Sequence, residues 1–143
     1  MTMPIRITCL CGKTSVELHG EPAARANCHC AACRDFYGTA MLSATAWHAD
    51  AVRPTQNSGR IFRHPVKQLS KTFCAECAEV MFGTNRLGMR VVPNAIVART
   101  TGGTLDAHLV PTMHLFYRHR VIDIADTLPK FLDGWDGPLY DAS

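Results

Sequence analysis

The sequence predicts a small, β-rich domain, and three observations support this. Its 143 residues fit the usual size of one domain, and its 47% apolar residues are enough to fill a hydrophobic core. Its apolar residues recur in short runs separated by Gly, Pro and polar turn residues, which is the pattern of short strands. Its seven cysteines fall in three tight groups, which suit metal-binding knuckles. We therefore expect residues 1–143 to form a single domain of short antiparallel strands.

The predicted elements are mostly strands and turns. The first strand, residues 5–8, runs into a cysteine pair, and Gly12 supplies the backbone freedom that a tight knuckle needs. In residues 14–18, Val16 and Leu18 lie on one face, and Gly20 then begins a turn. Further strands are expected at residues 38–42, 60–63, 68–73, 80–84, 90–92, 95–99 and 114–117.

Two short helical turns complete the prediction. One covers residues 31–37, after the middle cysteine group. The other covers residues 128–132, with Asp126 as its cap. Residues 132–143 form a C-terminal tail, which is expected to be frayed from residue 138 onward.

Composition excludes several classes of protein. The first eight residues contain no long apolar run and no small-residue cleavage site, and no stretch of the chain reaches the apolar length of a membrane span. We therefore expect a cytoplasmic protein with reduced thiols and no membrane partner. Fifteen basic and twelve acidic residues leave a net charge of +3, interpreted as a mild excess spread along the chain. With no cluster of basic and aromatic residues, no nucleic-acid partner is expected.

The cysteine groups carry the chemistry. They are Cys9-x-Cys11, Cys28-x-Cys30-x-x-Cys33 and Cys74-x-x-Cys77. Zinc takes about four ligands in a closed structural site and about three in a catalytic site, so seven thiols divide as four and three. A disulfide framework fits less well, because an odd count leaves one thiol over and such close pairs rarely join distant segments. We therefore expect two Zn²⁺ ions per chain.

The outer two cysteine pairs are the structural candidates. Joining Cys9 and Cys11 to Cys74 and Cys77 would tie the first strand to the middle of the sheet, and four thiolates leave no coordination position open. Cys28, Cys30 and Cys33 instead leave a position for water or a substrate thiol. The alternative is that His29, His64 or His114 closes this site, although His29 is expected to point away from a metal held by its two neighbours.

Several motifs resemble those of the glutathione-dependent formaldehyde-activating family, which includes centromere protein V. Cys28-His29-Cys30-Ala31-Ala32-Cys33-Arg34 is similar to its C-H-C-x-x-C-R signature, Phe73 to Cys77 to its F-C-x-x-C motif, and Cys9 to Gly12 to its C-x-C-G opening. Gly103 to Asp106, Pro111 to Phe116 and Leu128 to Phe131 resemble its later motifs. The resemblance covers about residues 5–131.

The resemblance implies a fold, a metal content and an activity. The fold is a β-tent with two zinc ions, one structural on Cys9, Cys11, Cys74 and Cys77, and one at the active site on Cys28, Cys30 and Cys33. The activity is that of a carbon-sulfur lyase, S-(hydroxymethyl)glutathione synthase-like, which joins glutathione or a similar small thiol to formaldehyde or another small aldehyde. The chain departs from the family pattern at Ala78-Glu79, where the family usually has Gly-Thr.

A mechanism follows from these expectations. A thiol in the open position on the three-cysteine zinc becomes a thiolate near neutral pH and attacks the aldehyde carbon. His114, His29 or Arg34 is the candidate for steadying the resulting alkoxide or the substrate carboxylates. The alternative function is a non-enzymatic zinc module that binds a protein or nucleic-acid partner.

Overall fold

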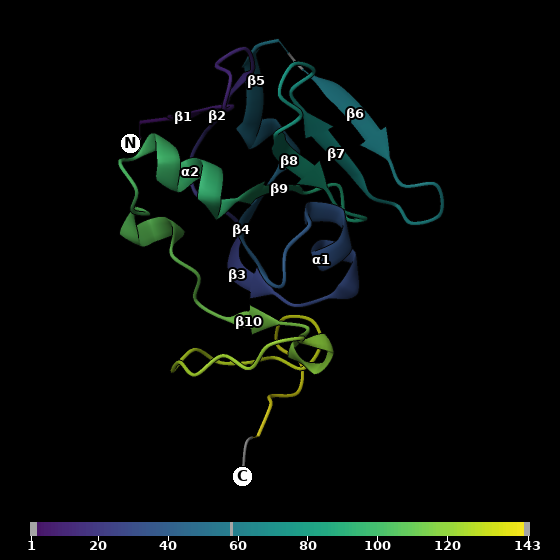
Figure 1. Cartoon of the computed structure of the whole chain (residues 1–143). Coiled ribbons are helices and arrows are strands. Elements are labelled where there is room, and N and C mark those ends of the chain that lie inside the picture. Colours follow the sequence, from purple (N-terminus) through teal and green to yellow (C-terminus); the bar gives the residue numbers. More distant parts are fainter. Residues whose placement is uncertain (1–2, 58, 142–143) are drawn as a thin grey trace. The chain divides into compact units, whose positions relative to one another are not determined.

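The computed structural model describes residues 3–57 and 59–141, which divide into two compact units. Unit one comprises residues 1–24 and 45–109, and unit two comprises residues 25–44 and 110–143. The described residues form ten short strands and two α-helices, so the predicted β-rich class is confirmed (Figure 1). A single domain over residues 1–143 stays a prediction.

Unit one contains two sets of antiparallel strands. The first set is a three-stranded sheet in the order β1-β2-β5, formed by β1 (Ile5–Thr8), β2 (Ser15–Leu18) and β5 (Val52–Gln56). The second set pairs in sequence order and places β6 at its edge; it consists of β6 (Arg60–Arg63), β7 (Ser70–Phe73), β8 (Val80–Thr84) and β9 (Arg90–Pro93). Short 3-10 turns lie at Ala49–Ala51, directly before β5, and at Ala107–Leu109, near the end of the unit.

One hydrophobic core lies within unit one. The alternation that the sequence shows at Val16 and Leu18 places both side chains inside, at 1% exposure each. Two cysteines, Cys9 and Cys74, belong to the same core. Its other members are Ile7, Trp47, Val52, Met81, Phe82, Val92, Ile96, Val97 and Leu109. Two of the candidate metal ligands are therefore also core residues of this unit.

The predicted strand over residues 95–99 is wrong, because this segment forms helix α2 (Asn94–Thr100). The β-branched Ile96 and Val97 favour a strand by propensity. In the structure Pro93 occupies the N-cap position, and both side chains are buried where α2 packs against β1 and β9. Burial of one helix face has outweighed a weak local preference.

Three strands were not predicted: β3 (Ala24–Cys28), β4 (Leu42–Trp47) and β5. The strand expected at residues 38–42 is mostly a turn, because Gly38 adopts a left-handed φ of 64° as the C-cap of α1 (Ala31–Tyr37). Helix α1 itself confirms the helical turn predicted there. Pro54 argues against a strand at β5, but β5 lies at a sheet edge, where a missing amide is tolerated.

Unit two is organised around β3. The strand β10 (His114–Leu115) pairs with β3 in parallel, with His114 opposite Asn27, so the expectation of antiparallel pairing fails here. On its other side β3 is followed by β4, whose first residues, 42–44, belong to this unit. The predicted strand over residues 114–117 ends early, because Phe116 adopts a left-handed φ of 56° and starts a 3-10 turn at Tyr117–His119.

The C-terminal segment is extended and hydrogen-bonded. Asp126 Oδ1 accepts the Leu128 amide at 3.2 Å, as the predicted cap requires, but no helix follows. Pro129 explains this, because the residue before a proline is disfavoured in the helical region. The Leu132 amide donates to Pro138 and the Tyr140 amide to Lys130, both at 2.8 Å, so residues 138–140 are not frayed. Residues 142–143 of the predicted tail lie outside the described residues, as do residues 1–2.

Across the described part of the chain, no helix has the length and apolar character needed to cross a membrane.

Candidate metal centres

The outer two cysteine pairs meet in unit one. The sulfur atoms of Cys9, Cys11, Cys74 and Cys77 all lie within 4.8 Å of one another. The Cys9–Cys11 and Cys11–Cys74 Sγ distances are both 3.6 Å. Tetrahedral zinc with Zn–S bonds of about 2.3 Å would place its sulfurs about 3.8 Å apart. The donor set and its spacing therefore fit one closed zinc site.

Hydrogen bonds to the sulfurs of this four-cysteine group favour the thiolate form. The Thr14 amide donates to Cys9 Sγ at 3.3 Å, and the Glu76 amide donates to Cys74 Sγ at 3.4 Å. The Thr14 side chain and the amides of Cys77 and Glu76 lower the pKa of Cys74 to about 6. The thiolate is the form that binds metal. Because Cys9 and Cys74 are also core residues, an ion here would be coupled directly to folding.

Glu79 and Arg99 hold the Cys9–Cys11 loop in place through hydrogen bonds. Glu79 Oε1 accepts the Leu10 amide at 2.9 Å. Arg99 donates to both carboxylate oxygens of Glu79, at 2.9 and 2.6 Å, and to the Thr8 carbonyl at 2.8 Å. Glu79 stands where the family usually has threonine. Glu79 and Arg99 together therefore link the loop after Cys77 to the backbone on both sides of Cys9.

The backbone at Ala78 is strained. Ala78 has a φ of 67° in the left-handed region, where a glycine would be at ease. The family usually has glycine at this position. A left-handed conformation costs an L-residue about 1–2 kcal/mol.

Ala78→Gly is therefore expected to stabilise the protein by about 1 kcal/mol, after allowance for the greater freedom of glycine in the unfolded chain. The measurement is the free energy of unfolding from denaturant titration of the zinc-loaded protein. The matched control is Ala75→Gly in the same knuckle, where φ is not positive and glycine should destabilise by about 0.5–1 kcal/mol. Equal effects of the two substitutions would contradict the strain at Ala78.

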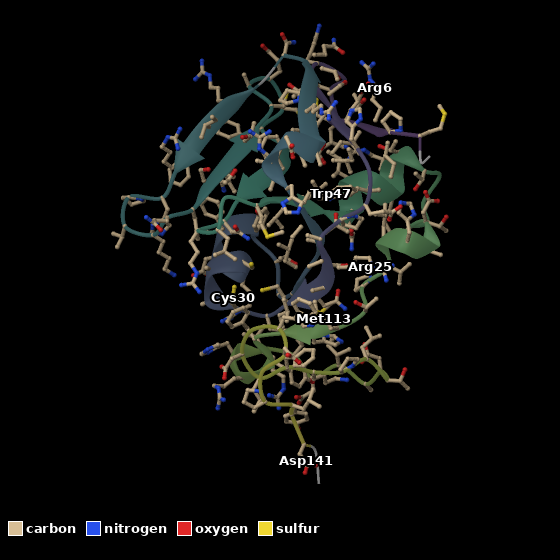
Figure 2. The ribbon with its side chains drawn as sticks, turned by 180° about the vertical axis from the view of Figure 1, so that it is seen from behind. Arg6, Arg25, Cys30, Trp47, Met113 and Asp141 are labelled. Atoms are coloured by element: carbon tan, nitrogen blue, oxygen red, sulfur yellow. The ribbon has the colours of Figure 1, made fainter. Side chains whose placement is uncertain are left out.

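The middle group forms a second cluster, in unit two. The sulfurs of Cys28, Cys30 and Cys33 lie within 4.8 Å of one another, with Cys28 and Cys30 only 3.4 Å apart. Cys28 ends β3, Cys30 is the N-cap of α1 (Figure 2), and the Cys33 amide donates to Cys30 Sγ at 3.3 Å. All three are half-buried and therefore partly open to solvent.

No fourth His, Cys, Asp or Glu joins this cluster among the residues that the structure describes. His114 has both ring nitrogens engaged elsewhere, and His64 Nδ1 accepts the amides of Val66 and Lys67 in the turn between β6 and β7. All seven cysteines are free thiols rather than disulfides. The geometry thus favours a three-ligand site with one position left for another ligand.

The three thiols of this cluster shift one another's pKa values. Hydrogen bonds from Cys28 and then Cys33 lower the pKa of Cys30 to about 2. The same contacts act in the opposite direction on the neighbours, because Cys30 raises the pKa of Cys28 to about 12 and both partners raise that of Cys33. Three thiolates this close together repel one another, and a bound cation would offset that repulsion, so the residues present suit zinc.

His29 leads away from the sulfurs into a buried chain of hydrogen bonds. His29 Nε2 lies 2.9 Å from His114 Nδ1, and His114 Nε2 lies 2.8 Å from Asp126 Oδ2. Lys130 Nζ donates to Asp126 Oδ1 at 2.7 Å. Both imidazoles are fully buried. Sequence reasoning named His29 and His114 but missed Asp126 and Lys130 as their partners, since no local spacing connects these positions.

The Asp126 carboxylate determines which atoms donate and which accept in this series of hydrogen bonds. Burial opposes ionisation of Asp126, but hydrogen bonds from Lys130 and His114 outweigh it and lower the pKa of Asp126 to about 2. An ionised Asp126 only accepts, so His114 donates from Nε2, and a neutral His114 then accepts at Nδ1. His29 therefore donates from Nε2, and its Nδ1 carries the lone pair. That atom is buried and has no hydrogen-bond partner in the described structure.

His29 is expected to stay neutral across the physiological range. Burial is the largest cause that lowers the pKa of His29 from 6.5 to about 4, and the nearby positive charges of Arg120 and Arg34 act in the same direction. The folded protein then binds fewer protons than the unfolded chain between these pH values, so this group's contribution to stability is lost as the pH falls from about 6.5 to about 4. Nitrogen-15 NMR should show a bare Nδ1 and a protonated Nε2 at pH 6. A His29 ring that is half protonated at that pH would contradict the buried chain.

Two further features of unit two lie next to this series of hydrogen bonds. Arg34 Nε donates to the His29 carbonyl at 3.3 Å, which holds the half-buried guanidinium beside the cysteine loop. A cavity of about 580 Å³ lies where Asp126 and Lys130 reach the surface. Its wall includes Arg120, whose guanidinium lies 4.4 Å and 4.7 Å from the ring centroids of Tyr117 and Tyr140.

Comparison with known proteins places the chain in a family. No curated protein matches it. Among solved structures it is similar to a crystal structure of a Rhodobacter sphaeroides protein from a structural genomics programme, with 21% sequence identity over 64% of this chain and 85% of that one, and a TM-score of 0.49. The model of the glutathione-dependent formaldehyde-activating enzyme family matches residues 4–119. Since this match spans most of the sequence and contains all seven clustered cysteines, the chain belongs to the glutathione-dependent formaldehyde-activating family.

Proposed function

We propose that this protein is a zinc-dependent enzyme of the carbon-sulfur lyase type, which adds glutathione or a similar small thiol to formaldehyde or another small aldehyde. The observation that carries the proposal is the three-cysteine cluster, whose sulfurs are half-buried and lack a fourth protein ligand among the described residues. Membership of the family supports chemistry with glutathione and formaldehyde at the level of the family.

The reaction makes modest chemical demands. One C–S bond forms, the carbonyl double bond becomes a single bond, and the proton of the thiol ends on the carbonyl oxygen, with no oxidation or reduction. A zinc ion held by Cys28, Cys30 and Cys33 would supply a cation that lowers the pKa of the incoming thiol. The residues around it need only orient the two reactants and stabilise the oxygen as it becomes negative.

Arg34 is the proposed contact for that negative charge. Its Nε is held by the His29 carbonyl, so the terminal nitrogens of a fixed guanidinium can face an alkoxide or a substrate carboxylate. His29 is a poor general base, because its pKa of about 4 lies well below neutral pH. We therefore assign His29 and His114 as positioning residues, which hold the cysteine loop through the buried chain to Asp126.

The remaining four cysteines complete the proposal. Cys9, Cys11, Cys74 and Cys77 would hold a second, structural zinc that links two knuckles within the core of unit one. Both sites need reduced thiols, so a reducing compartment such as the cytoplasm is part of the proposal.

Glutathione should enter the coordination shell of the three-cysteine site. Protein purified under reducing conditions is expected to hold about two zinc ions per chain by elemental analysis. After replacement by Co²⁺, glutathione should strengthen the sulfur-to-metal charge-transfer band. S-methylglutathione, whose thioether is a much weaker ligand, is the matched control and should not do so. An unchanged spectrum at saturating glutathione, in protein shown to be metal-loaded, would overturn the proposal and favour a binding module.

A further inference from the structure

The positive charge of this chain is concentrated in one segment. Residues 51–75 contain five of the fifteen Lys and Arg residues and none of the twelve Asp and Glu residues. The rest of the chain therefore holds ten basic and twelve acidic residues and is slightly negative. The interpretation of the charge as spread along the chain is wrong. An uneven distribution of this kind indicates a surface for an anionic partner.

Four of these five cations lie on the β6–β7 hairpin of unit one. They are Arg60, Arg63, Lys67 and Lys71. β6 is the edge strand of its set, and all four of its residues are exposed. Its two central residues are apolar, with Ile61 at 56% and Phe62 at 46% exposure. Charged residues alone would protect an edge strand from aggregation. Exposed apolar residues between the arginines do not serve that purpose, so they call for another explanation.

The register places an aromatic ring among cations on one face of the hairpin. Phe62 lies directly opposite Lys71, so the two side chains share a face, and Lys71 Nζ lies 5.8 Å from the centroid of the Phe62 ring. Arg60, two residues from Phe62, projects from the same face of β6. The opposite face carries Thr72, which is 7% exposed, directly opposite Ile61, which is 56% exposed. The face with the aromatic ring carries Arg60, Phe62 and Lys71, so the expectation that no basic and aromatic residues cluster is wrong.

The turn of this hairpin is held in a defined shape. His64 Nδ1 accepts the amides of Val66 at 3.0 Å and Lys67 at 2.9 Å, and the His64 amide donates to the Leu69 carbonyl at 2.8 Å. At the start of β6, Gly59 has a φ of 73°, and a Cβ there would lie 2.4 Å from the Phe73 carbonyl oxygen. Three hydrogen bonds therefore hold the turn after β6, which lowers the ordering cost of presenting the cations beside it.

We infer that this hairpin face binds single-stranded nucleic acid, in addition to the chemistry proposed for the cysteine site. The cations Arg60, Lys71 and Lys67 match a phosphate backbone, and Phe62 offers a surface on which a base can stack. An acidic peptide would use the cations but has no aromatic base to place on the ring. The combination of ring and cations on one face therefore favours a nucleic acid over an acidic protein.

The inference is tested with the zinc-loaded full chain and a fluorescently labelled single-stranded oligonucleotide, by fluorescence anisotropy. Binding is expected to weaken with salt, with a slope of log K against log salt of about −2 to −3 for three to four neutralised phosphates. Arg60→Glu and Phe62→Ala should each weaken binding about tenfold. The matched control is Arg6→Glu, an exposed arginine on β1 (Figure 2), which makes the same change in net charge and should leave affinity within about twofold.

Three outcomes would overturn the inference. The first is no binding at low salt. The second is an equal effect of Arg6→Glu and Arg60→Glu, which would mean that only net charge matters. The third is unchanged binding by Phe62→Ala together with full competition by polyglutamate, which would indicate an acidic protein partner. Melting curves of all variants check that each is folded, and the response to glutathione should be unchanged in every one.

Discussion

Cys74→Ser is expected to leave little soluble, folded protein. Cys74 is fully buried, belongs to the core of unit one and is one of four sulfurs that fit a structural zinc. A structural zinc supplies about 10–16 kcal/mol of apparent binding free energy, and a domain has only about 5–15 kcal/mol of net stability. Losing one ligand of that site therefore removes a large part of what keeps the chain folded. Circular dichroism, melting curves and soluble yield measure the effect.

The control for this prediction is the same substitution in the other cluster. Cys30→Ser changes the same sulfur to the same oxygen, but at a half-buried residue outside the core. A Cys74→Ser protein that melts close to the wild type, with Cys30→Ser the more damaged of the two, would reverse the assignment of the structural and working ions.

Cys30→Ser is expected to abolish the response to glutathione and to spare the fold. The zinc content should fall from about two ions per chain to about one, because two thiolates and a neutral hydroxyl form a much weaker site. Helix α1 should survive, since Cys30 is its N-cap and accepts the Cys33 amide, a role that serine performs well. We expect a melting temperature within a few degrees of the wild type.

Elemental analysis and the cobalt spectrum measure this result. The matched control is Ser43→Ala on β4, which removes a hydroxyl in the same unit from a residue outside the cysteine cluster. It should retain two zinc ions and the full glutathione response. A Cys30→Ser protein with two zinc ions and an intact response would show that the working site lies elsewhere.

Much of the candidate site could be predicted because metal knuckles are local. Cys9 and Cys11, or Cys74 and Cys77, are separated by one or two residues, so a single turn presents both sulfurs whatever the rest of the chain does. The division into four and three also follows from ligand numbers alone. The structure brings together the same groups of sulfurs that the spacing predicts.

Strand prediction succeeded where alternation was strong and failed where long-range packing decides. Val16 and Leu18 alternate with polar neighbours, and β2 was predicted. Ile96 and Val97 also favour a strand by propensity, yet they lie in α2 because one helix face is buried against β1 and β9. Local preference differs by less than about 1 kcal/mol between the two states, whereas burying each side chain is worth about 1.5–3 kcal/mol.

By itself the sequence determined the β-rich class, the family motifs and the two groups of sulfur ligands, since these depend on neighbours a few residues apart. Only the tertiary structure decided which side chains surround those ligands. His29 meets His114 across 85 residues, and Asp126 then fixes which ring nitrogen of each carries the proton. Phe62 and Lys71 share a face only because β6 and β7 pair in one register. Such contacts are set by burial and strand pairing, which combine distant segments and leave no local pattern to read.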